Sequence, residues 1–210
     1  VQLRDLVDFE SFVQLIGRYD ARTPEITSVI RDLDERGWEI GLHGSYHTAT
    51  DRDRLAVEKE RIETALGKQI QGGRQHYLNV SPPETWKIYR SLGLRYDTSL
   101  GSSSDSGFHF GYDVFHPFDD EFTVFPLTLM EQHLPDPRTD FDAAWEECKS
   151  LLDTAVREQA VMTVLFHPRY FSESEFPGYR ALYRQLIERA LEWNAWVGPP
   201  GDFQDVFLAD

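Results

Sequence analysis

The stretch TPEITSVIRDLDERGWEIGLHGSYH, residues 23–47, indicates the fold class. Thr23 suits the position before a helix, Pro24 its first turn and Gly37 the residue after its end. Apolar residues recur at helical spacing between them, and the following WEIGLH has the pattern of a short strand that ends at His43. The stretch therefore predicts an amphipathic helix that leads directly into a strand.

The same alternation continues to the end of the chain and predicts a parallel sheet covered by helices, an α/β fold. A long polar loop is expected over 98–120, and Pro126 interrupts one strand. Further helices are predicted over 51–67, 81–93, 140–158 and 177–193, and further strands over 70–78, 94–97, 121–130, 160–167 and 195–198. A closed barrel needs one or two more strands than these, so the first strand of the domain is expected to lie upstream.

Composition limits the possible partners. The 210 residues carry a formal net charge of −15, which disfavours binding to nucleic acid or to an anionic membrane. No apolar run approaches the roughly 18–20 residues of a membrane span. The first residues, VQLRDLVDFE, show no signal peptide, which slightly favours a cytoplasmic location. Cys148 lies in a helical apolar pattern and is interpreted as a core residue.

Ionisable side chains end four separate predicted strands. They are His43, Arg74 with His76, Asp97 and His167. Parallel α/β folds bring the carboxyl ends of their strands to one rim, where the chemistry of such folds is found. Polar residues commonly end strands, but four such ends predict a functional site at this rim.

His43 and His47 are candidate ligands of a divalent metal ion. If the chain turns helically after the strand, their spacing places both rings on one face, where they could hold Zn²⁺ together with a carboxylate. The alternative is a surface or supporting role, because an isolated pair with this spacing is common. The remaining histidines, His109, His116 and His133, are expected at the surface.

His167 follows the most strongly apolar strand of the chain, VMTVLF, and has two interpretations. It is either a buried histidine with a satisfied hydrogen bond or a general acid or base, since imidazole titrates near neutrality. Arg74 suits a role as partner to a carboxylate, and Asp97 is the candidate partner. A simple surface charge is the alternative for Arg74.

In this order the residues resemble the motifs of the polysaccharide deacetylase family, the NodB-homology domain of carbohydrate esterases. HGSYH resembles its metal-binding histidine pair, RQHY its Arg-x-Pro-Tyr motif, YDTS its following Asp motif and LFH its closing Leu-x-His. The resemblance implies a distorted (β/α) barrel of about seven strands, with residues 1–210 forming a single catalytic domain that is N-terminally incomplete.

The resemblance also implies roles for individual residues. His43 and His47 would hold the metal, and Arg74, supported by Asp97, would orient the catalytic carboxylate. The Tyr77 N–H would help to form the oxyanion hole, Leu165 would line the acetyl-methyl pocket and His167 would act as the general acid. The chain departs from the family in having His76 in place of proline, no evident tryptophan after the Asp motif, and no Asp-Asp motif upstream of His43.

The sequence therefore predicts a metal-dependent hydrolase, most simply a zinc enzyme, that removes acetyl groups from an N-acetylated or O-acetylated carbohydrate. Because the Asp-Asp motif is missing, an alternative is an inactive domain of this type that binds carbohydrate or a partner protein. A different barrel metallohydrolase acting on another amide ranks lower, since such enzymes more often carry H-x-H on their first strand.

Overall fold

The helix and the strand predicted within residues 23–47 both form in the computed structural model, which describes residues 20–208. Helix α2 (Pro24–Glu35) begins after Thr23, whose backbone is extended. The chain leaves the helix through Gly37, whose φ of 85° is a left-handed conformation that glycine adopts at little cost. Strand β1 (Leu42–Gly44) follows and is shorter than the predicted strand.

The other elements follow in nearly the predicted order. The further helices are α3 (Arg52–Leu66), α4 (Glu84–Ser91), α5 (Phe141–Glu158), α6 (Tyr179–Glu192) and α7 (Pro200–Phe203). The further strands are β2 (Gly72–Gln75), β3 (Tyr96–Asp97), β4 (Thr123–Val124), β5 (Leu127–Met130) and β6 (Thr163–Leu165). Short 3₁₀ turns, η2 (Tyr46–Thr48), η3 (His76–Leu78), η4 (Glu131–His133) and η5 (Pro168–Phe171), follow the ends of four strands, and η6 (Gln204–Leu208) is a π-helical turn.

The strand predicted over 195–198 does not form, and this expectation was wrong. Trp196 instead packs its ring against Phe203 and Phe207 at the C-terminal end of the described chain, with ring centroids 5.7 and 5.6 Å away. An aromatic side chain in this segment therefore covers α7 and η6, and the segment pairs with no strand. The segment's short apolar pattern is equally compatible with such a loop.

The described strands form two small parallel sheets, and the closed barrel is not observed. One sheet has the order β1-β2-β3-β4 and the other pairs β5 with β6. In the first sheet His43 lies opposite Arg74, and Gly73 lies opposite Asp97. Within the described residues no strand joins β1 to β6, so both keep one unpaired edge. The α/β class and the parallel pairing of the strands were predicted correctly. The predicted barrel is not seen, because the two sheets do not close on each other.

Pro126 marks the joint between the two sheets. The flanking residues keep their hydrogen bonds to the segment around β3, because Phe125 N–H donates to the Asp97 carbonyl and Leu127 N–H to the Leu100 carbonyl. Proline has no N–H to donate, so the ladder breaks at this residue and β5 continues in the second sheet. The interruption predicted at Pro126 is therefore confirmed.

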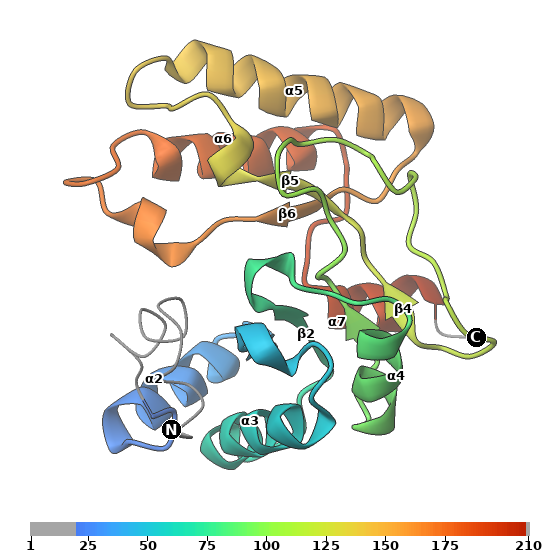
Figure 1. The fold of residues 1–210 in the computed structure, drawn as a ribbon. Coiled ribbons are helices and arrows are strands. Elements are labelled where there is room, and N and C mark those ends of the chain that lie inside the picture. The colour runs from blue at the N-terminus through green and yellow to red at the C-terminus, as the bar shows by residue number, and fades with distance from the viewer. Residues whose placement is uncertain (1–19, 209–210) are drawn as a thin grey trace.

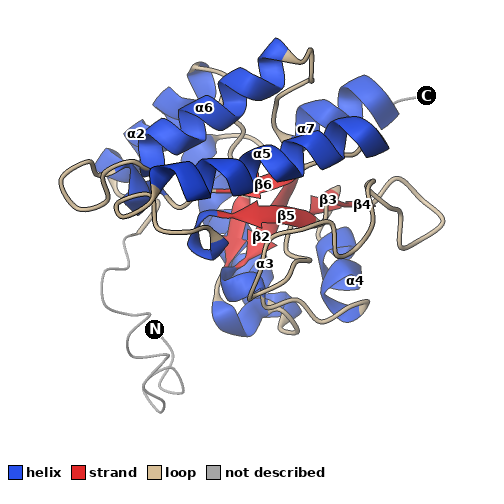
Figure 2. Ribbon diagram, turned by 90° about the horizontal axis from the view of Figure 1, so that it is seen from above, coloured by secondary structure: helices blue, strands red, loops and turns tan. Residues whose placement is uncertain are grey.

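Each sheet has its own helices and its own core. Figure 1 shows α5 and α6 beside β5 and β6, with α2, α3 and α4 around the first sheet, and Figure 2 shows the strands enclosed by helices. Cys148 is fully buried in the core between α5 and α6, as predicted. The first core includes Leu42, Leu55, Trp86, Tyr89 and Val124, and the second Leu129, Ala144, Leu152, Leu182 and Leu186. None of the described helices combines the length and apolar character needed to cross a bilayer.

The two strands of the second sheet differ in burial. All residues of β5 are buried, whereas all residues of β6 remain partly exposed although their sequence is apolar. The exposed side of β6 borders a cavity of about 1000 Å³ that also reaches β1. The unpaired edges of the two sheets thus face a common space, and the candidate site lies along it.

Candidate active site

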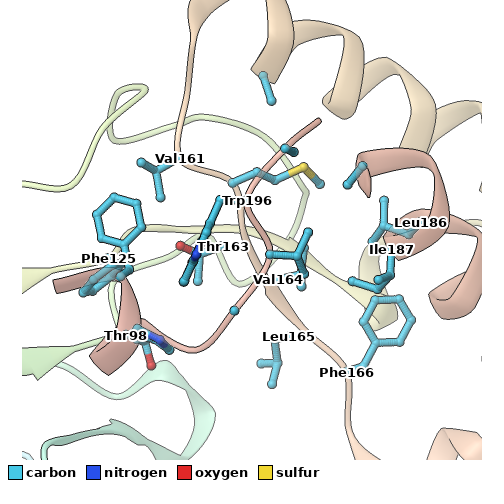
Figure 3. Close-up of a pocket in the computed structure, with 18 of the residues that line it drawn as sticks. Thr98, Phe125, Val161, Thr163, Val164, Leu165, Phe166, Leu186, Ile187 and Trp196 are labelled. Carbon is cyan, nitrogen blue, oxygen red and sulfur yellow. The ribbon is translucent and has the colours of Figure 1, made fainter. Parts of the chain in front are cut away.

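The cavity brings together four of the seven predicted site residues. His43, Arg74, Leu165 and His167 all line it. His47, Tyr77 and Asp97 lie outside its lining, and none of the described Asp or Glu residues takes part in it. Figure 3 shows the largely apolar remainder of the wall, which includes Phe125, Val161, Val164, Phe166, Ile187 and Trp196.

His167 is paired with a buried carboxylate that the sequence analysis missed. Its Nδ1 lies 2.5 Å from Oε1 of Glu131, which is completely buried at the start of η4. A carboxylate that accepts from Nδ1–H fixes the tautomer and leaves Nε2 to exchange a proton. The other oxygen of Glu131, Oε2, has no hydrogen-bond partner among the described residues.

His167 was predicted as a site residue because it follows the end of a parallel strand. The same reasoning applies to Glu131, because Glu131 directly follows β5. Strand β5 pairs in parallel with β6, with Met130 opposite Leu165, so the residues after both strands emerge at the same edge. The pair is therefore a consequence of sheet register. His167 is partly exposed, as a group that exchanges protons with a ligand must be.

His43 is held at the end of β1 by a backbone contact. Its Nδ1 lies 3.1 Å from the carbonyl oxygen of Arg74 on the neighbouring strand. The residue is exposed along the cavity, and neighbouring protein atoms still displace part of the water around its ring. This partial burial, together with the positive charges of His76 and Arg74, lowers the pKa of His43 to about 4. His43 is therefore neutral near neutral pH, which is the form that binds metal ions.

His47 does not share a helical face with His43. His43 belongs to a strand and His47 to η2, which starts only at Tyr46, so the assumed helical turn between them is absent. The His47 ring packs edge-on against Tyr46 with centroids 5.2 Å apart. Among residues 20–208, no three His, Cys, Asp or Glu side chains are grouped so that they could hold a metal ion.

His76 lies next to His43. It is the first residue of η3, directly after β2, and its ring centroid is 5.1 Å from that of His43, with the planes at 75°. On its other side it contacts the Tyr77 ring, with centroids 4.4 Å apart. His76 therefore lies between the predicted metal ligand His43 and the predicted oxyanion residue Tyr77.

Arg74 and Asp97 lie near one another, but no hydrogen bond joins these two described residues. The Arg74 guanidinium donates from Nε to the Thr98 carbonyl at 2.9 Å. Burial lowers the pKa of Arg74, and the negative charge of Asp97 opposes this effect. In place of the direct pairing expected from the sequence, the two side chains interact electrostatically through space.

Asp97 is completely buried and has partners of its own. It accepts hydrogen bonds from the Ser99 hydroxyl at 2.5 Å and the Ser99 N–H at 3.1 Å. Trp86, on α4, donates its indole N–H to the same carboxyl at 3.1 Å. Burial raises the pKa of Asp97, and these hydrogen bonds and Arg74 lower it. Asp97 thus receives an indole hydrogen bond from a tryptophan that precedes it in the sequence.

Tyr77 is both exposed and conformationally unusual. Its side chain is 70% exposed, and its backbone has φ 58° and ψ 23°, followed by Leu78 with φ 54°. A left-handed conformation costs a non-glycine residue roughly 1–2 kcal/mol. The loop is tied to η2 by Asn79, whose side-chain amide donates to the Tyr46 carbonyl at 2.6 Å. Strain of this kind is often found at functional sites.

The other histidines differ among themselves. His109 is exposed and lies 3.3 Å from Asp105, and His116 is exposed with Nδ1 3.2 Å from the Phe122 carbonyl, both as expected. His133 was expected at the surface, but both of its ring nitrogens are buried and have no hydrogen-bond partner in the described part of the chain. It belongs to η4, the turn that also buries Glu131.

Comparison with known proteins gives a fold but no family. No family model and no curated protein matches the sequence. The structure is similar to that of a probable polysaccharide deacetylase from Pseudomonas aeruginosa PAO1, with a TM-score of 0.62, 15% identity and 89% of this chain covered. It is also similar to a GH57 branching enzyme from the hyperthermophilic archaeon Thermococcus kodakaraensis, solved with glucose, with a TM-score of 0.62, 11% identity and 96% of this chain covered.

Both similar structures are longer than the present chain. The chain spans 66% of the first and 53% of the second. At these identities the likeness concerns the fold alone. Two proteins described as a deacetylase and a branching enzyme therefore share with this chain an arrangement of helices and parallel strands.

Proposed function

We propose that this chain is a carbohydrate-modifying hydrolase that removes acetyl groups from an N-acetylated or O-acetylated sugar. The observation that carries the proposal is the His167–Glu131 pair, in which a buried carboxylate holds a histidine that lines the cavity. Proton transfer by a positioned histidine contributes about 10²–10⁴-fold to a rate. The likeness of fold to a probable polysaccharide deacetylase supports the same substrate class.

In this proposal each residue has a defined task. His167 protonates the leaving amine or alkoxide as the acyl bond breaks, and Glu131 stabilises the charged imidazole. Leu165, which lines the cavity two residues before His167, contacts the acetyl methyl group. The Tyr77 N–H donates to the oxyanion, an interaction worth about 3 kcal/mol when a single such donor is removed.

The proposed reaction includes a divalent metal ion, with Zn²⁺ as the expected species. His43 and His47 would hold it, and the neutral state of His43 fits this role. When bound, such an ion polarises a carbonyl and lowers the pKa of water from about 15.7 to about 7. As the side chains stand, residues 20–208 supply no third ligand, so these two histidines account for only part of a site.

None of the described residues is proposed as the general base that would take a proton from the attacking water. No carboxylate of the described residues lines the cavity, and Asp97 is held by Ser99 and Trp86. Arg74, which lines the cavity, would orient a carboxylate supplied from outside the described residues. The same observation favours the alternative function, a non-catalytic domain that binds carbohydrate or a partner protein.

Glycoside hydrolysis is the less favoured chemistry for this site, although one similar structure is a GH57 enzyme. Glycosidases generally place two carboxyl groups about 5–10 Å apart on either side of the scissile bond. In the described chain the cavity wall contains none, and the ionisable residues that line it are His43, Arg74, Tyr96 and His167.

Acetate release tests the proposal. The purified chain is incubated with Zn²⁺ and acetylated chito-oligosaccharides or acetylated xylan, and free acetate is measured. We expect release that falls at least about 10²-fold in His167→Ala and is unchanged in His109→Ala, which alters a histidine outside the cavity lining. Binding of these glycans without acetate release would instead support the non-catalytic alternative.

A further inference from the structure

The cavity is far larger than an acetyl group requires. Its volume of about 1000 Å³ lies at the upper end of the range of roughly 300–1000 Å³ found for sites that take drug-sized ligands. The proposed function uses only the part of the cavity that is lined by His43, Arg74, Leu165 and His167. The rest of the space has no ligand assigned to it.

The wall of this remaining space is apolar and uncharged. Apart from His43, Arg74 and His167, the described residues that line the cavity include no Lys, Arg, His, Asp or Glu, and uncharged polar side chains are a minority among them. Figure 3 shows several of the apolar residues, among them Val161, Val164, Leu186, Ile187 and Trp196. A sugar buried against such a wall would lose hydrogen bonds to water, whereas an alkyl chain is stabilised there.

Several large apolar side chains of the wall are exposed to solvent. Val156, Trp196 and Phe207 line the cavity and are 58%, 40% and 52% exposed. The rings of Trp196 and Phe207 are in contact, with centroids 5.6 Å apart, so this exposure is contiguous. Contiguous exposed apolar surface is a mark of ligand-binding grooves and of interaction sites. The wall therefore presents an apolar surface that a ligand would cover.

The apolar space is continuous with the acyl side of the proposed reaction. Val161, Thr163 and Leu165 occupy alternate positions before His167, and all four line the cavity. Alternate residues of an extended chain share one side, and at about 3.3 Å per residue Val161 lies about 20 Å from His167. Leu165, the proposed contact of the acetyl methyl group, is only the first of this series. A longer acyl chain would continue from Leu165 past Thr163 toward Val161.

We infer that the preferred substrate carries an acyl group longer than acetyl, whose alkyl chain lies in the apolar cavity along β6. This inference rests on the proposed function and narrows its substrate class to sugars that bear a fatty acyl group in amide or ester linkage. In the reaction the water oxygen bonds to the acyl carbon, the bond from that carbon to nitrogen or oxygen breaks, and the leaving atom takes a proton. The products are a fatty acid and the free amine or hydroxyl of the sugar.

A series of N-acyl glucosamines tests the inference. The whole chain is titrated by calorimetry with N-acetyl-, N-hexanoyl-, N-octanoyl- and N-dodecanoylglucosamine, each below the concentration at which it forms micelles, and release of glucosamine is measured separately. Burial of one methylene raises affinity by up to about four-fold. We therefore expect the affinity to rise with chain length, by at least about ten-fold from the acetyl to the octanoyl compound.

A substitution that narrows the cavity locates the alkyl chain. Ile187 lines the cavity on α6, and Leu191 on the same helix is exposed and lies outside the lining, which makes Leu191→Trp the matched control for Ile187→Trp. Ile187→Trp should lower the ratio of octanoyl to acetyl affinity by at least about ten-fold, because the larger side chain occupies the space of several methylenes. Leu191→Trp should keep the wild-type ratio, and circular dichroism establishes that both variants are folded.

Equal affinity across the series would overturn the inference, as would a wild-type ratio in folded Ile187→Trp. Absence of binding at every chain length would also overturn it, and would favour a peptide strand at the unpaired edges of β1 and β6 as the occupant of the cavity. The outcome is separable from that of the proposed function. Binding that strengthens with chain length, without release of glucosamine, contradicts the hydrolase and leaves the alkyl site standing. Acetate release without any effect of chain length contradicts the alkyl site alone.

Discussion

His167 and Glu131 are joined by a 2.5 Å contact between Nδ1 and Oε1, although 36 residues separate them in the chain. The contact exists because β5 and β6 run in parallel and end at the same edge, so that each delivers its next ionisable residue to one place. Glu131 is completely buried, whereas His167 reaches the cavity. Glu131 is therefore held in place by the core, and His167 is available to a ligand in the cavity.

Replacing Glu131 by glutamine tests this pair. Glu131→Gln keeps the size of the side chain but cannot stabilise a charged imidazole, so kcat for acetate release should fall by about 10²-fold or more. Steady-state kinetics of acetate release measures the effect.

Glu173→Gln is the matched control, because Glu173 is an exposed glutamate outside the cavity lining. It should leave kcat as in the wild type. A Glu131→Gln variant with the wild-type kcat would show that the carboxylate is only structural.

Asp97 should contribute to stability through its hydrogen bonds. Asp97→Ala leaves the Trp86 indole N–H and the Ser99 hydroxyl without their acceptor in a buried position. Each unsatisfied group costs about 1–3 kcal/mol, and in a chain of this size each kcal/mol lowers Tm by about 2–4 °C. Asp97→Asn, which retains an acceptor oxygen, should lose less. Thermal unfolding followed by circular dichroism distinguishes the two variants, and equal Tm values would contradict the expected order.

The lowered pKa of His43 predicts a pH-dependent stability. The pKa falls from 6.5 to about 4 on folding, so the unfolded chain binds a proton more readily than the folded chain between these values. The contribution of His43 is therefore fully present above pH 6.5 and is lost as the pH falls toward 4. His43→Gln should flatten the curve of unfolding free energy over this range, measured in the presence of a chelator. An equally steep curve in that variant would contradict the shift.

The left-handed backbone at Tyr77 predicts a difference between two truncations. Tyr77→Ala and Tyr77→Gly both remove the ring, but only glycine adopts φ 58° without a steric cost. The glycine variant should be more stable than the alanine variant by about 1 kcal/mol. Denaturant unfolding of both variants measures the difference. A glycine variant that is the less stable of the two would show that the strain is absent.

Local signals in the sequence predicted the elements well. The cap of α3 is a short-range interaction, because Asp51 accepts a hydrogen bond from the Arg54 N–H at the start of the helix. Thr23 precedes α2 as predicted, but its side chain makes no capping hydrogen bond. Local apolar patterns also predicted that His43, Arg74, Asp97 and His167 lie at the ends of parallel strands. These features depend on residues that lie close together in the chain.

Contacts between distant segments could not be predicted in this way. Whether the sheet closes depends on pairing between β1 and β6, which are more than a hundred residues apart, and no local pattern encodes it. Glu131 was missed because its role depends on His167, which lies 36 residues further along the chain and meets it only through the pairing of β5 with β6. The contact of His76 with His43 depends on the register of β1 and β2, which only the structure supplies.

The joint at Pro126 has a mechanical consequence for the site. His43 and Arg74 belong to the first sheet, and Glu131 and His167 to the end of the second. The two halves of the proposed chemistry therefore belong to separate sheets, which are joined where Phe125 and Leu127 donate hydrogen bonds to the segment around β3. The position of His167 relative to His43 thus depends on the main chain on either side of Pro126.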